Sequence, residues 1–488
     1  MGKSVAIIGS GFSSLAASCY LAQAGYDVTI YEKNDSIGGR ARQLKRDGFC
    51  FDMGPTWYWM PDVFERFFDD FSLYPSDFYE VEKLNPAYSV YFGEHDFITI
   101  EDTLDKICNM FEKEEPGSSK HLKKFISDAQ HNYEVAIKDL VYRPGISPFE
   151  LLTPETLKKV DQFFSTIKKD VRKKFKNDRL AKILEFPVLF LGAKADTTPS
   201  FYSFMNYADF GIGTFHPKNG MYQVILGIAK LAQQLGVTIE TNAVVDGILE
   251  ENGIATGLSI NGEEIFSDVV LSGADYHHSE TLLPPSLRQY SESYWKKKIF
   301  APSALMFYVG FNKKLINVTH HTLFFDVDFE THAADIYDDP KWPDDPLFYA
   351  SFPSITDKTV APEGKENGIF LIPLAPGLED TWELRKTYFE KIISRFERLT
   401  GQEISEDILF KESFCINDFK SAYNSYKGNA YGLANTLLQT AFLRPKLKSK
   451  KVSNLFFTGQ LTVPGPGVPP SLISGKLAAD LIRKYCPN

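Results

Sequence analysis

A glycine-rich turn between a strand and a helix, inside the first 31 residues, constrains the fold of this chain more than any other feature. Ser4–Ile8 is a short apolar run that leads into Gly9 and Gly11. Residues 13–24 are rich in alanine and predict a helix, and Asp27–Tyr31 predicts a second strand. A βαβ unit with a glycine turn is typical of a doubly wound α/β fold that binds a dinucleotide.

The turn itself, Gly9-Ser10-Gly11-Phe12-Ser13-Ser14, matches most of a phosphate-binding loop. The first glycine makes the tight turn, the second lets the backbone approach a pyrophosphate, and the following helix supplies free N–H groups. Ser14 departs from the motif, because a third glycine there would allow close packing of helix on sheet. Glu32, 23 residues after Gly9, can accept hydrogen bonds from ribose hydroxyls and would repel a 2'-phosphate. The pattern therefore argues against NADP and leaves FAD and NAD.

Two further glycine-rich segments favour FAD. Gly38-Gly39-Arg40-Ala41-Arg42 follows Glu32 closely and offers open backbone and cationic donors to a second phosphate region. Near the end of the chain a strand at 454–458, a Gly/Pro loop at 459–470 and a helix from Ser471 are expected, and that helix N-terminus would stabilise negative charge on a reduced flavin. The alternative is a βαβ unit with glycine turns and no ligand.

Composition narrows the function classes. The 488 residues carry a net charge of -10, which disfavours a nucleic-acid partner because phosphate contact needs a basic face. The five cysteines are scattered without a Cys/His cluster, so we expect no metal site, no disulfide framework and a reducing compartment. No run of 18 apolar residues predicts a membrane span. Aromatic residues make up 14% of the chain, which indicates either a large apolar ligand cavity or an aromatic-rich core.

The chain alternates between α/β and helical character. We therefore predict a Rossmann-like, doubly wound FAD-binding domain interwoven with a β-sheet substrate domain and a helical lid. The FAD-binding domain is assigned to residues 1–100, 211–290 and 441–488, the lid to 101–210, and the substrate domain to 291–440. The basic run from Lys168 to Lys176 in the lid is either a solvated helix face or a contact with anionic membrane lipid.

Together these motifs resemble the phytoene desaturase family of bacterial and fungal carotenoid desaturases, within the wider FAD amine-oxidase-like group. The resemblance covers nearly the whole chain and is most specific in the Pro-Gly-x-Gly-Val-Pro of residues 464–469. Asn219 replaces a glycine of the family's Pro-x-Gly-Gly-Met segment, and Gln460 stands where many relatives in the wider group carry an acidic residue.

The resemblance implies which residues contact FAD. Val245 is expected at the adenine, Glu32 at the ribose, and the glycines with Arg40 at the diphosphate. Residues 54–56 and 459–469 are expected around the ribityl chain and the isoalloxazine. The full expected set is Gly9, Gly11, Phe12, Ser13, Glu32, Lys33, Gly39, Arg40, Gly54, Pro55, Thr56, Val245, Gly459, Gln460, Gly467, Val468 and Pro469.

The implied reaction introduces C=C bonds into a C40 polyene by hydride transfer to flavin N5. Since no second dinucleotide motif and no dithiol pair is visible, quinone or oxygen is the expected electron acceptor. Orientation of the polyene across the flavin supplies most of the catalysis.

A catalytic base is hard to identify from sequence. Glu185 lies in an apolar stretch that would raise its pKa, and it is either a base or a buried carboxylate bonded to an arginine or to backbone. His320 and His321 are either structural or near the substrate. Trp57, Tyr58 and Trp59 belong either to the core or to the cavity wall.

Four functions follow from the resemblance. The leading one is a phytoene-directed desaturase, with a later-step 3,4-desaturase acting on hydroxylated carotenoids close behind. A flavin-dependent carotenoid isomerase and a non-catalytic lipid-binding escort are the others. We expect a cytoplasmic protein, peripherally associated with the inner face of a membrane through its lid.

Overall fold

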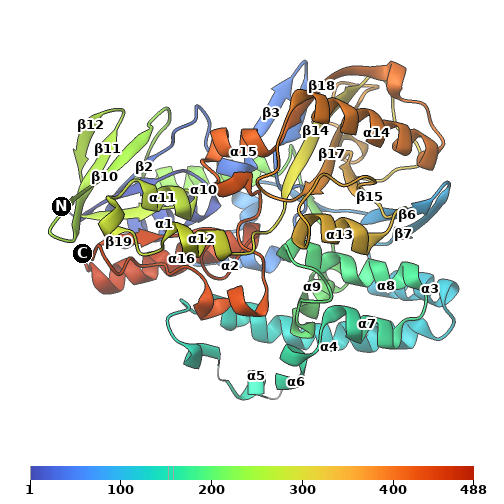
Figure 1. The fold of residues 1–488 in the computed structure, drawn as a ribbon, viewed down its shortest axis with the longest axis horizontal. Coiled ribbons are helices and arrows are strands. Elements are labelled where there is room, and N and C mark those ends of the chain that lie inside the picture. Colours follow the sequence, from blue (N-terminus) through green and yellow to red (C-terminus); the bar gives the residue numbers. More distant parts are fainter. Residues whose placement is uncertain (1, 152, 158) are drawn as a thin grey trace.

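The computed structural model describes residues 2–151, 153–157 and 159–488. Figure 1 shows an α/β part on the left, a large sheet at the upper right and a group of helices beneath that sheet. The two termini lie together at the edge of the α/β part, where the backbone N–H of Lys3 donates to Oδ1 of Asn488 at 2.7 Å.

The α/β part is built on a five-stranded parallel sheet with the order β19-β13-β1-β2-β9. Its strands are β1 (Ser4–Ile8), β2 (Asp27–Tyr31), β9 (Thr238–Glu240), β13 (Val269–Ser272) and β19 (Leu455–Phe457). Strands from three distant parts of the chain therefore pair directly. This confirms the predicted α/β fold with a parallel sheet.

Side chains of β1 alternate between two covering layers. Val5 and Ile7 face a layer of three helices, α1 (Phe12–Gln23), α10 (Tyr222–Gln234) and α16 (Val468–Tyr485). Within this layer α1 packs against both α10 and α16. Ala6 and Ile8 face the three-stranded sheet of β10 (Val245–Glu251), β11 (Ile254–Ile260) and β12 (Glu263–Phe266).

Helix α16 starts earlier than its sequence predicts. Its first residue is Val468 rather than Ser471, and Pro469 and Pro470 lie in its first turn. Proline is tolerated there because the first N–H groups of a helix have no partner within it. The helix N-terminus therefore directly follows Gly467, whose φ of 116° requires a glycine.

A seven-stranded sheet has the order β18-β14-β17-β16-β15-β6-β7. Its strands are β6 (Tyr88–Gly93), β7 (Asp96–Ile100), β14 (Ser303–Phe311), β15 (His321–Phe324), β16 (Phe348–Ser351), β17 (Glu366–Leu374) and β18 (Ile408–Phe414). All pairings are antiparallel except β15 with β6. Helix α14 (Trp382–Thr400) contributes to the aromatic core on one face of this sheet.

The predicted boundary at residue 100 of the FAD-binding domain does not match the membership of the two sheets. We placed residues 1–100 in the FAD-binding domain, but β6 and β7 belong to the seven-stranded sheet, where Ser89 lies opposite Thr322. The pairing joins segments more than 200 residues apart, so no local pattern indicates it. The three-unit division of the chain otherwise stays a prediction.

The region from 101 to 210 is mainly helical, as its charged amphipathic pattern indicates. It contains α3 (Leu104–Glu114), α4 (Ser118–Lys138), α5 (Pro154–Leu157), α6 (Val160–Phe164), α7 (Ile167–Lys174), α8 (Asp178–Glu185) and α9 (Phe204–Asn206). Within the described residues, no helix is both long and apolar enough to cross a membrane.

Shorter elements complete the fold. They are β3 (Gln43–Arg46), β4 (Phe49–Asp52), β5 (Val81–Lys83), β8 (Phe215–Pro217), α2 (Pro61–Asp69), α11 (Tyr276–Thr281), α12 (Glu292–Lys297), α13 (Phe329–Tyr337) and α15 (Ile416–Tyr423).

Candidate functional site

A cavity of about 250 Å³ opens where β1, β2, β13 and β19 end, and we refer to it as the cofactor cavity. In parallel α/β sheets ligands bind at these carboxyl ends. The cavity brings together the predicted residues Gly9, Gly11, Phe12, Ser13, Glu32, Lys33, Gly39, Arg40, Gly54, Pro55, Val245, Gly459, Gln460, Gly467 and Val468. The other two predicted contacts, Thr56 and Pro469, line a second cavity described below.

The glycines of the first turn have the geometry that a phosphate-binding loop requires. Gly9 has a φ of 83° and donates its N–H to the carbonyl of Tyr31 at 2.8 Å, which ties the start of the loop to the end of β2. A Cβ atom added to Gly11 would meet no atom within 4 Å, so this face of the backbone is open. Gly11 also caps α1, whose first N–H groups have no partners within the helix.

Ser14, the departure from the motif, is accommodated from the opposite side. Its side chain is fully buried, and a Cβ atom added to Gly273 would lie 2.0 Å from its Oγ. The close approach that a third glycine would provide in α1 is thus provided by Gly273, just after β13. Sequence analysis missed this compensation because the two residues are far apart in the chain.

Glu32 is fixed in position at the end of β2. Its carboxylate accepts hydrogen bonds from the backbone and side chain of Ser10 at 3.0 and 2.7 Å, and from those of Asn34 at 2.9 and 2.7 Å. Neither Ser10 nor Asn34 was predicted, although both line the cofactor cavity. The four contacts leave the carboxylate oriented before any ribose binds.

Arg40 is the cavity's most unusual residue, because it is a buried cation without a carboxylate partner among the described residues. Its Nη2 donates to Oγ of Ser425 and to the carbonyl of Asn429 at 3.2 and 3.3 Å, while Nε has no partner. Burial lowers the pKa of its guanidinium. Gln460, the neutral residue that stands where relatives in the wider group carry an acid, does not offset this charge. The buried Asp275 attracts the guanidinium electrostatically but forms no ion pair with it, so an anionic diphosphate fits the unpaired donor and the positive charge.

A second cavity, of about 390 Å³, adjoins the first, and we call it the apolar cavity. Most of its wall is aliphatic or aromatic, with side chains from the helical region, from α13 and from β16 and β17. The two cavities share the wall residues Gly54, Pro55, Leu371, Tyr431, Gly467 and Val468. A ligand in the apolar cavity would therefore pass directly beside one in the cofactor cavity.

The aromatic cluster after the second glycine segment divides between wall and core. Trp57 and Trp59 line the apolar cavity. Tyr58 does not line it and lies in the core, where its hydroxyl is 3.1 Å from that of Tyr79. The alternation follows from the local extended backbone, in which neighbouring side chains point to opposite sides.

The comparisons with known proteins agree with this geometry. Residues 12–483 match the family model for flavin-containing amine oxidoreductases. A carotenoid 3,4-desaturase of Haloarcula japonica is 40% identical over 485 residues, covering 99% of this chain and 98% of that protein. A 4,4'-diapophytoene desaturase (4,4'-diaponeurosporene-forming) of Staphylococcus haemolyticus is 33% identical over 491 residues, covering 98% of each. The chain belongs to the carotenoid desaturases of the flavin-containing amine oxidoreductase family.

A solved structure extends the comparison to the fold. An oxidoreductase of Methanosarcina mazei superposes with a TM-score of 0.63 at 17% identity, covering 98% of this chain and 100% of that one. The family match also confirms FAD as the cofactor, and the unpaired Nε of Arg40, the open face of Gly11 and the oriented carboxylate of Glu32 fit it.

Glu185, our candidate base, is not brought to either cavity of this desaturase. It ends α8, and its buried carboxylate accepts from Nε and Nη2 of Arg172 at 2.7 and 3.1 Å. Burial raises its pKa, and the arginine opposes that shift. The structure thus matches the alternative of a carboxylate bonded to an arginine, because α8 turns Glu185 toward α7 instead of toward the substrate side.

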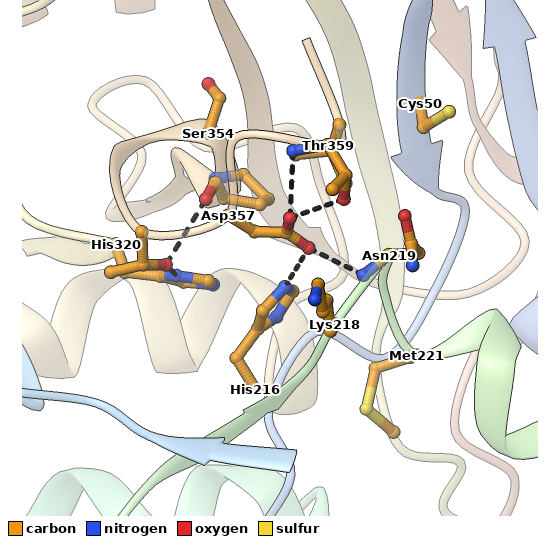
Figure 2. A network of polar contacts seen from close by, with 12 residues as sticks. Cys50, His216, Lys218, Asn219, Met221, His320, Ser354, Asp357 and Thr359 are labelled. Atoms are coloured by element: carbon orange, nitrogen blue, oxygen red, sulfur yellow. Dashed lines mark hydrogen bonds and ion pairs between the residues drawn. The ribbon is translucent and has the colours of Figure 1, made fainter. Parts of the chain in front are cut away.

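A buried polar network lies behind the wall of the apolar cavity, and Figure 2 shows one end of it. Oδ2 of Asp357 lies 3.1 Å from Nε2 of His216 and accepts the N–H of Asn219 at 2.6 Å. Burial opposes the shift, but these bonds and those from Thr359 hold the pKa of Asp357 below its usual value. Asn219 has a φ of 67°, a left-handed conformation that asparagine tolerates, which explains how it replaces a glycine.

Proposed function

We propose that this protein is an FAD-dependent desaturase that introduces C=C bonds into an acyclic carotenoid. The observation that carries the proposal is the junction of the two cavities at Gly54, Tyr431 and Gly467. An apolar polyene fits the one cavity and FAD the other, so that the reacting C–H bonds lie beside the cofactor.

The chain's own residues act mainly by position and by exclusion of water. FAD, when bound, supplies a hydride acceptor. Trp57, Trp59 and the other apolar wall side chains fix the polyene along the junction, and that orientation is the principal source of rate enhancement for an unactivated hydrocarbon. The same wall keeps water from the electron-deficient carbon that follows hydride loss.

The substrate's exact class is the finer part of the proposal. The relatives' names include both a carotenoid 3,4-desaturase and a diapophytoene desaturase, so desaturation at the 3,4 position and desaturation of a phytoene-type substrate are both supported. An escort without redox function is disfavoured, because Arg40 and Glu32 form a cofactor site that such a protein would not need. An isomerase would use the same two cavities but change no mass.

Product analysis tests the proposed function. The purified protein, loaded with FAD, is given phytoene, lycopene or a hydroxylated acyclic carotenoid in liposomes with a quinone. We expect one of them to lose two hydrogens per new double bond, with an absorbance shift to longer wavelength. A carotenoid that changes its chromatographic retention but keeps its mass would indicate an isomerase. Substrate that is unchanged in every case would favour a non-catalytic lipid-binding escort.

We further propose quinone or oxygen as the electron acceptor, since the five cysteines lie at separate places in the fold and offer no dithiol relay.

We also propose a cytoplasmic protein that contacts the inner face of a membrane, where an apolar substrate is stored. Residues 143–150 and 440–442 contribute to the wall of the apolar cavity. They lie close together, because Nζ of Lys446 donates both to the carbonyl of Gly145 at 2.7 Å and to that of Phe442 at 2.6 Å.

The membrane contact is better placed at these two loops than at the basic run of α7. Phe149 in the first loop and Leu438, two residues before the second, expose 75% and 76% of their surface, whereas two cations of α7 are paired within the protein. Lys168 binds Glu330 at 2.6 Å, and Arg172 binds Glu185 and Asp178. Exposed apolar side chains beside the wall of a lipid-binding cavity are typical of insertion into a membrane surface.

Liposome flotation distinguishes the two surfaces. The double variant Phe149→Ser with Leu438→Ser is expected to lose about 30-fold in vesicle binding, because burial of each removed side chain contributes roughly 1 kcal/mol and the two together about 2 kcal/mol. Lys173→Glu with Lys174→Glu serves as the matched pair and is expected to bind nearly as wild type. The opposite ranking would return the contact to α7.

A further inference from the structure

Two hydroxyl groups interrupt the apolar wall close to the cavity junction. Oγ1 of Thr56 lies 2.8 Å from the hydroxyl oxygen of Tyr349, and both residues line the apolar cavity. Tyr349 on β16 is opposite Leu371 on β17, and Leu371 belongs to the wall shared with the cofactor cavity. The tyrosine hydroxyl is therefore placed where a polyene passes the cofactor.

Behind Tyr349 a row of three imidazoles leads away from the cavity. Nδ1 of His321 lies 2.7 Å from the Tyr349 hydroxyl. The ring centres of His321 and His320 are 4.4 Å apart, those of His320 and His216 are 4.6 Å apart, and His216 reaches Asp357 (Figure 2). The row thus runs from the cavity wall to a carboxylate.

The imidazole rings are packed in place, but some of their nitrogen atoms lack hydrogen-bond partners among the described residues. The ring of Trp57 stacks on that of His321 with centroids 4.0 Å apart and planes at 10°. Within the described part of the chain, Nε2 of His320 and Nε2 of His321 are buried without hydrogen-bond partners. Buried polar atoms without partners are costly, and they are expected where function requires them.

Both histidines are neutral, and their burial disfavours the protonated forms. Burial lowers the pKa of both His320 and His321 well below the usual value, so each is neutral at pH 7 and keeps one ring nitrogen as an acceptor. Desaturation needs such an acceptor, because the substrate must lose a proton as well as a hydride. A C–H bond beside a carbocation is strongly acidic, so a neutral phenol and imidazole suffice as the base.

We propose that Tyr349 takes the proton from the substrate carbon and passes its own hydroxyl proton to Nδ1 of His321. This inference rests on the proposed function. Bound FAD would supply the acceptor for a hydride, with its electron pair, from the substrate. The neighbouring C–H bond then breaks, and its electron pair becomes the new π bond. The released proton forms a new O–H bond with Tyr349. The original hydroxyl proton leaves Tyr349 and forms an N–H bond with Nδ1 of His321. Tyr349 is the catalytic residue, and His321 positions it and receives its proton.

The test compares product formation in H2O and D2O at equal bound FAD. Tyr349→Phe keeps the ring but removes the hydroxyl, and we expect product formation to fall about 100-fold. His321→Asn retains a hydrogen-bonding group for Tyr349 but cannot take up a proton, and we expect a similar loss. Tyr91→Phe is the matched control, because it removes another buried hydroxyl from the same sheet, one bonded to the carbonyl of Asn317.

A solvent isotope effect separates the relay from a structural role. Wild-type protein and Tyr91→Phe are expected to form product more slowly in D2O, whereas both relay variants should lose this dependence. Tyr349→Phe with wild-type rate and isotope effect would overturn the relay alone. Wild-type protein that converts no carotenoid would overturn the proposed function and the relay with it.

Discussion

Arg40→Met protein is expected to lose about 100-fold in FAD affinity. The guanidinium is buried beside the cofactor cavity, with Nε unpaired and no carboxylate partner among the described residues. A hydrogen bond to a charged group contributes about 1.5–3 kcal/mol, which corresponds to roughly 10- to 150-fold in a dissociation constant. Titration of the apoprotein with FAD by flavin fluorescence measures the change.

The stability of the apoprotein gives a second, separate readout for Arg40. Removing the buried charge is favourable but also removes its attraction to the buried Asp275, so apo Arg40→Met should melt near apo wild type, while FAD should raise its Tm less. Arg42→Met is the control, since Arg42 is half-buried, contacts the same Tyr423 ring and does not line the cofactor cavity. Equal FAD affinity in Arg40→Met and wild type would contradict the diphosphate assignment.

Gly475→Val is expected to destabilise the protein by about 3 kcal/mol or more and to abolish FAD binding. A Cβ atom at Gly475 in α16 would lie 2.3 Å from the carbonyl oxygen of Ser13 and 2.9 Å from Cβ of Ala16 in α1. Since the clash involves backbone, α1 and α16 must separate, and both helices begin at the cofactor cavity. Thermal melting and bound flavin content measure the two effects.

Lys476→Val provides the matched control for Gly475. It introduces the same β-branched residue one position along the same helix, at a half-buried site. The ion pairs that it removes are long, because Nζ of Lys476 lies 3.6 Å from Asp70 and 3.7 Å from Asp480. Such pairs contribute at most about 1 kcal/mol. If both variants melted alike, close approach of α1 and α16 at Gly475 would not be what holds the cofactor helices together.

Most residues of the cofactor cavity could be predicted because their signals are local, while their individual contacts with FAD stay predictions. Gly9, Gly11 and Glu32 belong to a single βαβ unit, whose spacing follows from the lengths of a strand, a turn and a helix. Arg40 could likewise be assigned from its place in a glycine segment. The identity of the family followed from motifs spread along the chain, and the relatives at 40% and 33% identity confirm it.

The remainder depends on contacts between distant residues, which no local pattern encodes. Ser14 departs from the phosphate-binding motif, and only the structure shows that Gly273 leaves room for its side chain. Glu185 reads as a candidate base until Arg172 is found beside it. Tyr349 has no distinguishing sequence context, and only the pairing of β16 with β15 and β17 brings its hydroxyl to His321 and to the cavity junction.

Anaerobic bleaching of the bound flavin tests the central claim most directly, because it requires that a polyene in the apolar cavity reach the cofactor. The FAD-loaded protein is mixed with carotenoid-containing liposomes in the absence of oxygen and quinone, and the visible absorbance of its oxidised flavin is followed. We expect the flavin to bleach as one double bond forms per flavin, and to recover its colour when quinone is added. Flavin that stays oxidised with every acyclic carotenoid would contradict the account.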